Sequence, residues 1–249
     1  MSPVYPHYAL EVEDLTVSFD GFKAVDNFTM YVEKDELRTV IGPNGAGKTT
    51  LLDLICGRTR PSAGKITFME HDLTYMAEQA RVAVGVGRKF QTPSVYPKLT
   101  VFENLEVSYP SGRGVWGALF FKRSSEVVDR IHEVAKRIFL IDQLKTPADL
   151  LSHGQKQWLE IGMLLISDPA LLLLDEPVAG MTVREREQTA DLLRDICHGR
   201  STIIIEHDMK FVRKLASKVT VMHQGKLLAE GNIDEIEENP KVIEVYLGH

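Results

Sequence analysis

Residues 42–50 read GPNGAGKTT, and this stretch decides the fold of the chain. It lies between the apolar run of residues 37–41 and a helical pattern that carries four apolar side chains in residues 51–55. The spacing G-x-x-x-x-G-K-T lets the backbone curl so that successive N–H groups point at one anion, and the start of the helix adds partial positive charge. We therefore predict a phosphate-binding loop between a strand and a helix. A glycine-rich turn with a purely structural role is the alternative.

The residues that end this loop have distinct predicted roles. Lys48 is expected to reach the β- and γ-phosphates of a nucleotide, and the hydroxyl of Thr49 is expected to ligate Mg²⁺. The nucleotide-binding residues predicted within the loop are Gly42, Pro43, Asn44, Gly45, Ala46, Gly47, Lys48, Thr49 and Thr50.

A pair of carboxylates, Asp175 and Glu176, ends the apolar run of residues 171–174. Open α/β sheets bind ligands at the carboxyl ends of their strands, and neighbours along a strand point to opposite faces. We therefore predict that Asp175 holds Mg²⁺ through water and that Glu176 is the base that polarises an attacking water. A solvated acidic loop is the alternative.

Two more polar residues are candidates for the same edge of the sheet. His207 follows the apolar run of residues 203–205, where its imidazole could face the γ-phosphate. A structural histidine is the alternative there. Gln91, in RKFQTP, is equally compatible with an ordinary loop glutamine.

Short apolar runs alternate with amphipathic helical patterns along the chain, which is typical of a largely parallel sheet covered by helices. Dipeptides that favour tight hairpin turns occur at Asp20-Gly21 and Gln224-Gly225. The predicted buried strands are residues 37–42, 171–176 and 202–207, and antiparallel strands are predicted at residues 9–19 and 28–33 and within the hairpin 218–231.

Residues 92–168 follow a helical pattern instead. A T-x-x-E capping box at Thr100 and Glu103 opens a helix that runs to about Val107. A second helical stripe consists of Val127, Ile131, Val134 and Ile138. The fold class is therefore α/β, with one domain over residues 1–249. Its nucleotide-binding core, with the antiparallel β part, comprises residues 1–91 and 169–249, and residues 92–168 form an inserted helical subdomain.

Bulk properties narrow the class of protein. The chain has 249 residues, of which 26% are charged, and its net charge of −6 argues against broad nucleic-acid binding. No run approaches the ~20 apolar residues of a membrane helix, and the first residues lack the pattern of a signal peptide. Cys56 and Cys197 are predicted to be buried core residues, which suits a reduced cytosol.

The segment LSHGQKQWLEIG, residues 151–162, places small and polar residues directly before a helical run. Ser152 and Gln155 fit the S-x-x-Q capping box, in which each side chain satisfies a backbone N–H at the start of the helix. A local capping role is therefore one explanation of this motif.

Five motifs in this order resemble those of the ATP-binding subunits of ATP-binding cassette (ABC) transporters: GPNGAGKTT, FQ, LSHGQ, LLLLDEP and IIIEH. The resemblance covers essentially the whole chain. It implies a P-loop NTPase of the ABC ATPase fold, with a RecA-like mixed sheet core, an N-terminal antiparallel β subdomain and an inserted helical subdomain. It also implies ATP hydrolysis, with ATP and Mg²⁺ as the cofactors.

The same resemblance assigns further residues to the nucleotide. Gln91 looks like the Q-loop residue that contacts Mg²⁺ and couples to the membrane subunits. His207 looks like the switch histidine that helps hold the γ-phosphate and the attacking water. Phe19, 29 residues before Lys48, resembles the aromatic residue that stacks on adenine. Phe22 and a core role for Phe19 are the alternatives.

In this family the signature motif faces the nucleotide held by the other subunit, so that ATP closes a dimer and hydrolysis reopens it. The residues expected to complete the partner's site are Ser152, His153, Gly154 and Gln155. Two departures from the family pattern occur. His153 replaces a glycine of the usual LSGGQ, and Thr182 stands where many relatives carry an aspartate.

Finer resemblance points to the importer branch for branched-chain amino acids and urea. It rests on GFKAVDNF, VGRKFQTPSVYPKLTVFENL, DEPVAGM and the tail EGNIDEIEENPKVIEVYLG, while LSHGQKQWLEIG looks most like the urea-type ATPase. The implied solutes are urea, branched-chain amino acids or short amides. The implied partners are a second ABC ATPase subunit, two membrane permease subunits and, indirectly, a solute-binding protein, with no nucleic acid. The implied location is peripheral, at the cytoplasmic face of the inner membrane.

The sequence leaves two alternatives open, one for the function and one for an apolar segment. A lipid or lipopolysaccharide exporter ATPase and a soluble ABC ATPase of the iron–sulfur assembly type are the rival functions. The apolar segment VWGALFF, residues 115–121, either extends the face that docks on the permease or packs within the helical subdomain.

Overall fold

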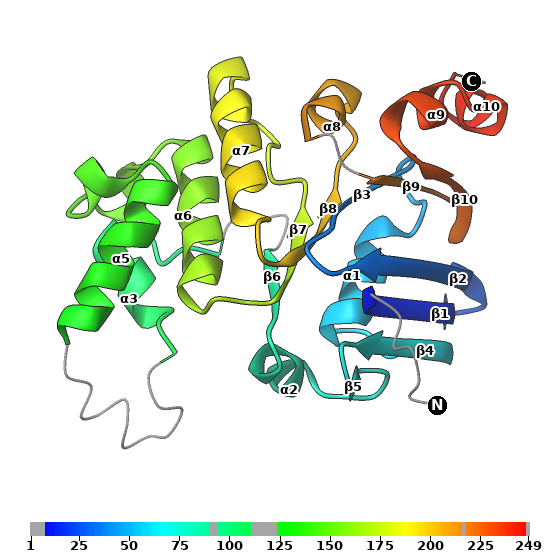
Figure 1. Cartoon of the computed structure of the whole chain (residues 1–249), viewed down its shortest axis with the longest axis horizontal. Helices are drawn as coiled ribbons and strands as arrows, with labels where there is room; N and C mark the ends of the chain where they lie inside the picture. The colour runs from blue at the N-terminus through cyan, green and yellow to red at the C-terminus, as the bar shows by residue number, and fades with distance from the viewer. Residues whose placement is uncertain (1–7, 90–93, 111–123, 216–217, 248–249) are drawn as a thin grey trace, which may run out of the picture. The chain divides into compact units, whose positions relative to one another are not determined.

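Backbone contacts divide the chain into two units, and the computed structural model describes residues 8–89, 94–110, 124–215 and 218–247 (Figure 1). The first unit comprises Met1–Arg88, Ala170–Glu176 and Leu193–His249, and the second comprises Lys89–Pro169 and Pro177–Leu192. Gln91 and the segment 115–121 lie outside the described residues. Within the described ranges, no helix is both long enough and apolar enough to cross a membrane.

Two sheets build the first unit. The antiparallel sheet has the order β2-β1-β4-β5 and consists of β1 (Tyr8–Phe19), β2 (Phe22–Glu33), β4 (Ala63–Phe68) and β5 (His71–Asp72). The mixed sheet has the order β10-β9-β3-β8-β7-β6 and consists of β3 (Leu37–Ile41), β6 (Val86–Lys89), β7 (Leu171–Asp175), β8 (Ser201–Ile205), β9 (Lys218–His223) and β10 (Lys226–Gly231). Since β8 pairs in parallel with both β3 and β7, the carboxyl ends of these three strands meet at one edge.

Both predicted hairpin turns are confirmed. Asp20 and Gly21 have φ angles of 48° and 85°, and the strands that they join close on the pair Phe19 and Phe22. Gln224 and Gly225 have φ angles of 48° and 76° between β9 and β10. Two successive residues with positive φ match the right-handed twist of an antiparallel pair, which explains the choice of Asp-Gly and Gln-Gly.

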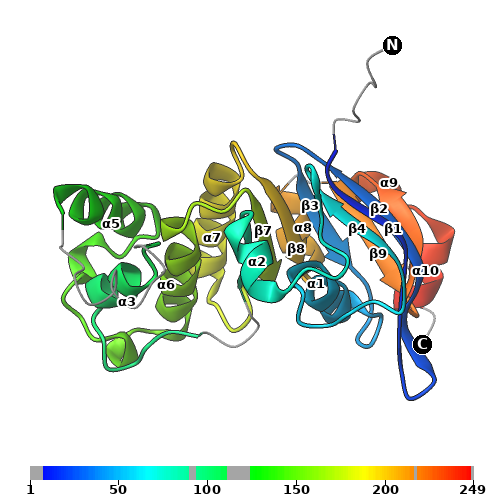
Figure 2. The same cartoon turned by 90° about the horizontal axis from the view of Figure 1, so that it is seen from below.

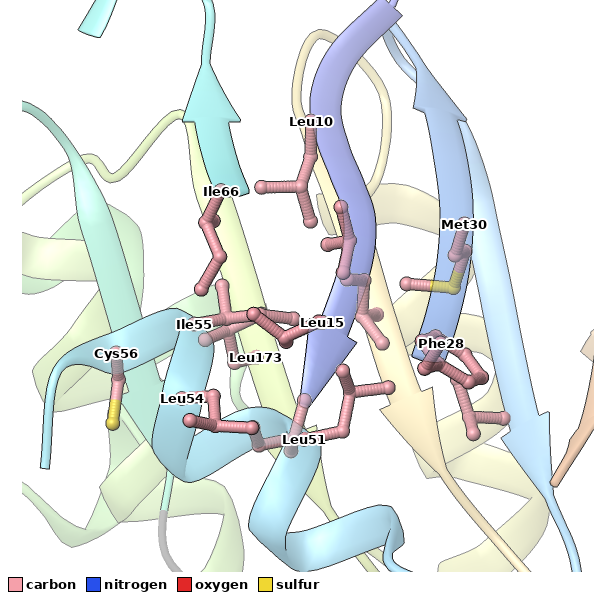
Figure 3. Close-up of a cluster of buried hydrophobic side chains, with 14 of the residues drawn as sticks. Leu10, Leu15, Phe28, Met30, Leu51, Leu54, Ile55, Cys56, Ile66 and Leu173 are labelled. Atoms are coloured by element: carbon pink, nitrogen blue, oxygen red, sulfur yellow. The ribbon is translucent and has the colours of Figure 1, made fainter. Parts of the chain in front are cut away.

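The core of the first unit forms where helix α1 (Lys48–Cys56) packs between the two sheets. Figure 3 shows Leu51, Leu54 and Ile55 of this helix pointing at Leu15 of β1 and Leu173 of β7. Every residue of β7 is buried, as the uninterrupted apolar run of its sequence predicts. Cys56 and Cys197 are both buried free thiols, which confirms their prediction as core residues. The other helices of this unit are α2 (Glu78–Ala83), α8 (Met209–Leu215), α9 (Ile233–Glu237) and α10 (Pro240–Leu247).

The second unit is helical. Its helices α3 (Val101–Val107), α5 (Ser125–Arg137) and α6 (His153–Ile166) pack against one another (Figure 2). The predicted capping boxes of Thr100 with Glu103 and of Ser152 with Gln155 are both present. The predicted stripe of α5 is buried: Val127, Ile131 and Val134 lie in the helix, and Ile138 follows as its C-cap.

The sequence led us to expect that the helical subdomain ends at residue 168. In the structure, a later segment also belongs to the helical unit. Residues 177–192, with most of helix α7 (Val183–Ile196), belong to the second unit. The indole N–H of Trp158 in α6 donates a hydrogen bond to the Thr189 hydroxyl of α7 at 2.8 Å, and both residues are buried. This buried bond ties α7 to α6, although 31 residues separate the two partners.

Helix α7 begins with a third capping box, between Thr182 and Glu185. The Glu185 N–H donates to the Thr182 hydroxyl at 3.3 Å, and the Thr182 N–H donates to the Glu185 carboxylate at 2.9 Å. This last bond is the main reason that the pKa of Glu185 lies below its ordinary value of 4.5. Thr182 therefore performs the N-cap role that an aspartate also performs, because both side chains offer an oxygen to the N–H groups of the first turn.

Thr182→Ala should lower the free energy of unfolding by about 1 kcal/mol, because it removes the oxygen that caps α7. The part of this loss in stability that depends on the ionised Glu185 carboxylate should be present in full at neutral pH. It should shrink as the pH falls through the lowered pKa of Glu185, since the protonated carboxyl no longer favours the capped state. Urea denaturation at pH 7 and pH 4 measures both effects.

Thr182→Asp is the matched variant, because it restores a capping oxygen. Its stability at pH 7 should stay close to that of the wild type. Equal destabilisation by alanine and aspartate would contradict a capping role for Thr182.

Candidate functional site

The loop of residues 42–47 joins β3 to α1 and is closely packed by backbone atoms from two directions. Gly42 and Gly47 have φ angles of 154° and 101°. A Cβ at Gly42 would overlap the carbonyl oxygen of Met222 in β9, and one at Gly47 would overlap the carbonyl oxygen of Ala24 in β2. Only glycine can occupy these two positions, because both the space and the backbone angles exclude a side chain.

Hydrogen bonds fix the middle of the loop. The Ala46 N–H donates to the Pro43 carbonyl at 3.2 Å, which closes a turn within the loop. The Gly225 N–H donates to the Ala46 carbonyl at 2.9 Å, so that the β9–β10 turn holds the loop from outside. The curled loop and the first turn of α1 together form a backbone geometry that can cradle an anion.

Lys48 folds back over this loop. Its ammonium group donates to the carbonyl oxygens of Gly42 at 2.7 Å and Pro43 at 3.0 Å, and only 8% of the residue is exposed. Burial lowers the pKa of Lys48, while attraction to Glu176 and Asp175 acts in the opposite direction. The chain thus places a cation and two anions at one edge of the mixed sheet.

Asp175 lies at the carboxyl end of β7 and is 1% exposed. Its Oδ2 atom is 3.8 Å from Nη2 of Arg88 in β6. The same guanidinium donates to Asp53 Oδ1 of α1 at 2.6 Å and to the Cys56 sulfur at 3.1 Å. Arg88 therefore links the carboxylate at the strand end to the helix that follows the loop.

Arg88 is the residue of this site that sequence reasoning missed. Its only signal is its place at the end of a short strand, three residues before Gln91. Nothing local distinguishes it from a surface arginine, because its partners Asp53 and Asp175 are 35 and 87 positions away in the sequence.

Glu176 and His207 meet at the ends of neighbouring strands. The Glu176 N–H donates to the Ile205 carbonyl at 3.0 Å, which joins the end of β7 to the end of β8. Its Oε1 atom is 3.4 Å from Nδ1 of His207. Both side chains are accessible, at 21% and 61% exposure, so water can reach the carboxylate. A carboxylate beside an imidazole can accept a proton from water and keep that water oriented.

Phe19 lies at the tip of the β1–β2 hairpin and is 48% exposed, which excludes the core role considered for it. Phe22 faces it across the turn and is 66% exposed. The hairpin therefore presents two accessible aromatic rings, and either ring could stack on a planar ligand.

The oxygen atoms at this edge suit a magnesium ion. Thr49 is exposed in the first turn of α1, and Asp175 ends β7. Mg²⁺ prefers hydroxyl and carboxylate oxygens, takes few protein ligands and completes its shell with phosphates and water. Among the described residues, no group of three or more His, Cys, Asp or Glu side chains could hold a metal ion. The third predicted ligand, Gln91, lies outside the described residues.

The signature residues lie at the start of α6 in the second unit. The Ser152 hydroxyl accepts a hydrogen bond from the Gln155 N–H at 3.2 Å and donates to Glu185 Oε1 at 3.3 Å. A Cβ at Gly154 would lie 2.5 Å from the same carboxylate oxygen. Glu185 therefore supports Ser152, and its carboxylate lies in the space that a side chain at position 154 would enter.

His153, the departure from LSGGQ, is accommodated by its own unit. Its Nε2 atom is 3.1 Å from the Ala179 carbonyl oxygen, and its ring lies against the Cα of Gly180. Gly180 has a φ of 71°, and a Cβ there would come within 3.0 Å of the ring. The imidazole is thus directed at the segment before α7.

The structure brings the first group of predicted residues together in the first unit: residues 42–50, Asp175, Glu176 and His207. The second group, Ser152 to Gln155, forms one helix start in the second unit.

Comparisons with known proteins agree with this arrangement. Residues 25–179 match the family model described as "ABC transporter", and residues 226–249 match the model described as "Branched-chain amino acid ATP-binding cassette transporter". The high-affinity branched-chain amino acid transport ATP-binding protein LivG of Salmonella typhimurium is 35% identical over 248 residues, which cover 96% of this chain and 97% of that protein. The probable LivG of Archaeoglobus fulgidus is also 35% identical, over 96% of this chain and 95% of its own length.

Solved structures show the same fold. The ADP conformation of MJ1267, an ATP-binding cassette of an ABC transporter, has a TM-score of 0.85 and 30% identity, and the match covers 97% of this chain and 99% of that one. A nucleotide-free ATP-binding cassette from an ABC transporter has a TM-score of 0.83 and 30% identity over 97% of this chain and all of its own. The predicted ABC ATPase fold is therefore confirmed. The chain belongs to the ABC transporter family and is one of its ATPases, which couple ATP hydrolysis to transport.

Proposed function

We propose that this chain is the ATPase subunit of an importer for branched-chain amino acids. The observation that carries the proposal is the match to branched-chain amino acid transport ATP-binding proteins over 96% of the chain. The C-terminal segment 226–249 also matches the family model of branched-chain amino acid ATP-binding cassette transporters. Urea, the solute suggested by LSHGQKQWLEIG, has no comparable support.

In this proposal residues 42–50 hold the phosphates of ATP. The N–H groups of the curled loop point at the phosphate oxygens, and the N-terminus of α1 adds partial positive charge. Lys48 exchanges its bonds to the Gly42 and Pro43 carbonyls for bonds to the β- and γ-phosphates. These carbonyl bonds keep the buried ammonium satisfied before ATP arrives. Phe19 stacks on the adenine ring, with its exposure as the supporting observation.

Thr49, Asp175 and Gln91 are the residues proposed to hold Mg²⁺, Asp175 through a water. When bound, the ion neutralises charge on the phosphates. The Arg88 guanidinium, 3.8 Å from Asp175 Oδ2, helps to orient this carboxylate.

Glu176 is the proposed general base. Its carboxylate accepts a proton from the water that attacks the γ-phosphate, and the nearby His207 holds that water and the γ-phosphate in place. The exposure of both side chains at adjacent strand ends supports these roles.

The proposal also requires a second ABC ATPase subunit, which is either another copy of this chain or a related chain. The start of α6, with Ser152, His153, Gly154 and Gln155, completes the nucleotide site of that partner through the partial positive charge of its N-terminus. ATP then joins two such subunits, and loss of the γ-phosphate lets them part. The bonds from Ser152 and His153 to the segment around α7 would keep this helix start rigid.

The remaining partners follow from the importer assignment. Two membrane permease subunits carry the solute path, a solute-binding protein delivers the solute, and this chain lies peripherally at the cytoplasmic face of the inner membrane. The proposed attachment to the membrane is through the permease subunits.

Glu176→Gln should retain ATP binding and lose about 10²–10⁴-fold in turnover, because the amide cannot accept a proton from water. The variant should also accumulate as an ATP-bound dimer. Phosphate release and size-exclusion chromatography with ATP measure the two effects.

Glu70→Gln is the matched control, because Glu70 is exposed on the turn between β4 and β5 in the same unit. Its turnover should equal that of the wild type. Near-normal hydrolysis by Glu176→Gln would remove Glu176 from the catalytic role.

Deletion of the gene in its own organism should abolish high-affinity uptake of radiolabelled leucine and leave the uptake of urea and of an unrelated sugar unchanged. Complementation with the wild-type chain should restore leucine uptake, and complementation with Glu176→Gln should not. Loss of urea uptake with normal leucine uptake would overturn the solute assignment and support the urea alternative.

A further inference from the structure

Helix α1 carries a second polar side chain, Asp53, on the face that presents Thr49. The two residues are four positions apart in the helix, so their side chains lie one turn above each other. Thr49 is one of the residues proposed to hold Mg²⁺. The Asp53 carboxylate has no part in the mechanism proposed above, but it bonds to the nearly buried side chain of Arg88.

Arg88 lies between two carboxylates and is not equally close to them. Its Nη1 atom donates to Asp53 Oδ1 at 2.6 Å and to the Cys56 sulfur at 3.1 Å. Its Nη2 atom is 3.8 Å from Asp175 Oδ2. Hydrogen bonds from N–H to oxygen span about 2.7–3.2 Å, so the contact with Asp175 is an ion pair at longer range. The guanidinium is therefore bonded to α1 and attracts Asp175 from a distance.

The burial of the two carboxylates makes this difference significant. The side chain of Asp175 is 2% exposed, and that of Asp53 is 24% exposed. Attraction between charges is stronger where water is excluded, so a guanidinium free to move by about 1 Å would pair closely with Asp175. Such a pair commonly has two parallel hydrogen bonds, one to each carboxylate oxygen. Those bonds would compete with a metal ion for the oxygens of Asp175.

We infer that Asp53 is a positioning residue for the magnesium site, because it holds Arg88 on α1 and keeps the guanidinium from closing on Asp175. The oxygens of Asp175 then stay available to Mg²⁺ and its water. Helix α1 contributes to the site twice, through the Thr49 hydroxyl and, one turn later, through Asp53. This inference rests on the proposed role of Asp175 toward Mg²⁺.

Asp53→Ala removes the carboxylate that holds Arg88 and keeps a residue that favours a helix. Calorimetric titration of the full chain with the ATP analogue AMP-PNP, once with Mg²⁺ and once with EDTA, measures how much the ion strengthens binding. This gain should fall about tenfold, as is typical when a residue that supports a metal ligand is lost. The affinity in EDTA should change less than about twofold. A merely structural role of Asp53 would change both titrations alike.

Asp234→Ala is the matched control. It also removes an aspartate carboxylate from a helix of the same unit, where Arg213 donates to Asp234 Oδ1 at 2.8 Å. Its gain in affinity with Mg²⁺ should equal that of the wild type. Thermal unfolding of both variants shows that the titrations are run well below each midpoint.

Arg88→Gln tests whether Asp53 acts through the guanidinium. In that background, Asp53→Ala should change the gain with Mg²⁺ less than about twofold, because the two residues are coupled. Equal effects of Asp53→Ala in both backgrounds would overturn the positioning role. An equal gain in Asp53→Ala and Asp234→Ala would do the same.

Asp175→Asn separates this inference from the assignment on which it rests. The variant should lose most of the gain with Mg²⁺ and keep its affinity in EDTA. An unchanged gain would overturn the magnesium assignment of Asp175 and the inference with it. A lost gain in Asp175→Asn together with a normal gain in Asp53→Ala would overturn the role of Asp53 alone.

Discussion

The rest of the site depends on the close approach of two carbonyl groups to the loop of residues 42–47. The carbonyls of Met222 and Ala24 lie where a Cβ of Gly42 or Gly47 would have to be. They belong to β9 and β2, so the mixed sheet and the antiparallel sheet both pack directly against the loop backbone. A loop packed in this way loses little further entropy when it binds an anion, because its conformation is already set. The shape of the nucleotide site is therefore a property of how the two sheets pack.

Charge at this edge is balanced before any ligand binds. Lys48 is nearly buried, and its ammonium is satisfied by two loop carbonyls and attracted by Asp175 and Glu176. Asp175 lies beside Arg88, which also binds Asp53. A buried charge without such partners would cost several kcal/mol, so each group is tolerated only because the others are present. The same balance makes the charges available to a ligand that carries both phosphate and a metal ion.

In the helical unit, Glu185 has a comparable organising role. Its carboxylate accepts bonds from the Thr182 N–H and the Ser152 hydroxyl and lies against Gly154. One side chain thus caps α7 and supports the signature start of α6. Both residues that depart from the family pattern fit this arrangement, because Thr182 is a sufficient N-cap and His153 is directed at the Ala179 carbonyl.

The sequence by itself determined the elements whose signals are local. The strand–loop–helix order around residues 42–50, the turns at Asp20-Gly21 and Gln224-Gly225 and the capping boxes at Thr100 and Ser152 depend on neighbours a few positions apart, and all were predictable. The tertiary structure alone decided the role of Arg88 and the assignment of α7 to the helical unit. Both depend on partners that lie tens of residues apart in the sequence. Local propensity carries no information about such partners, because the packing of the sheets and helices brings them together.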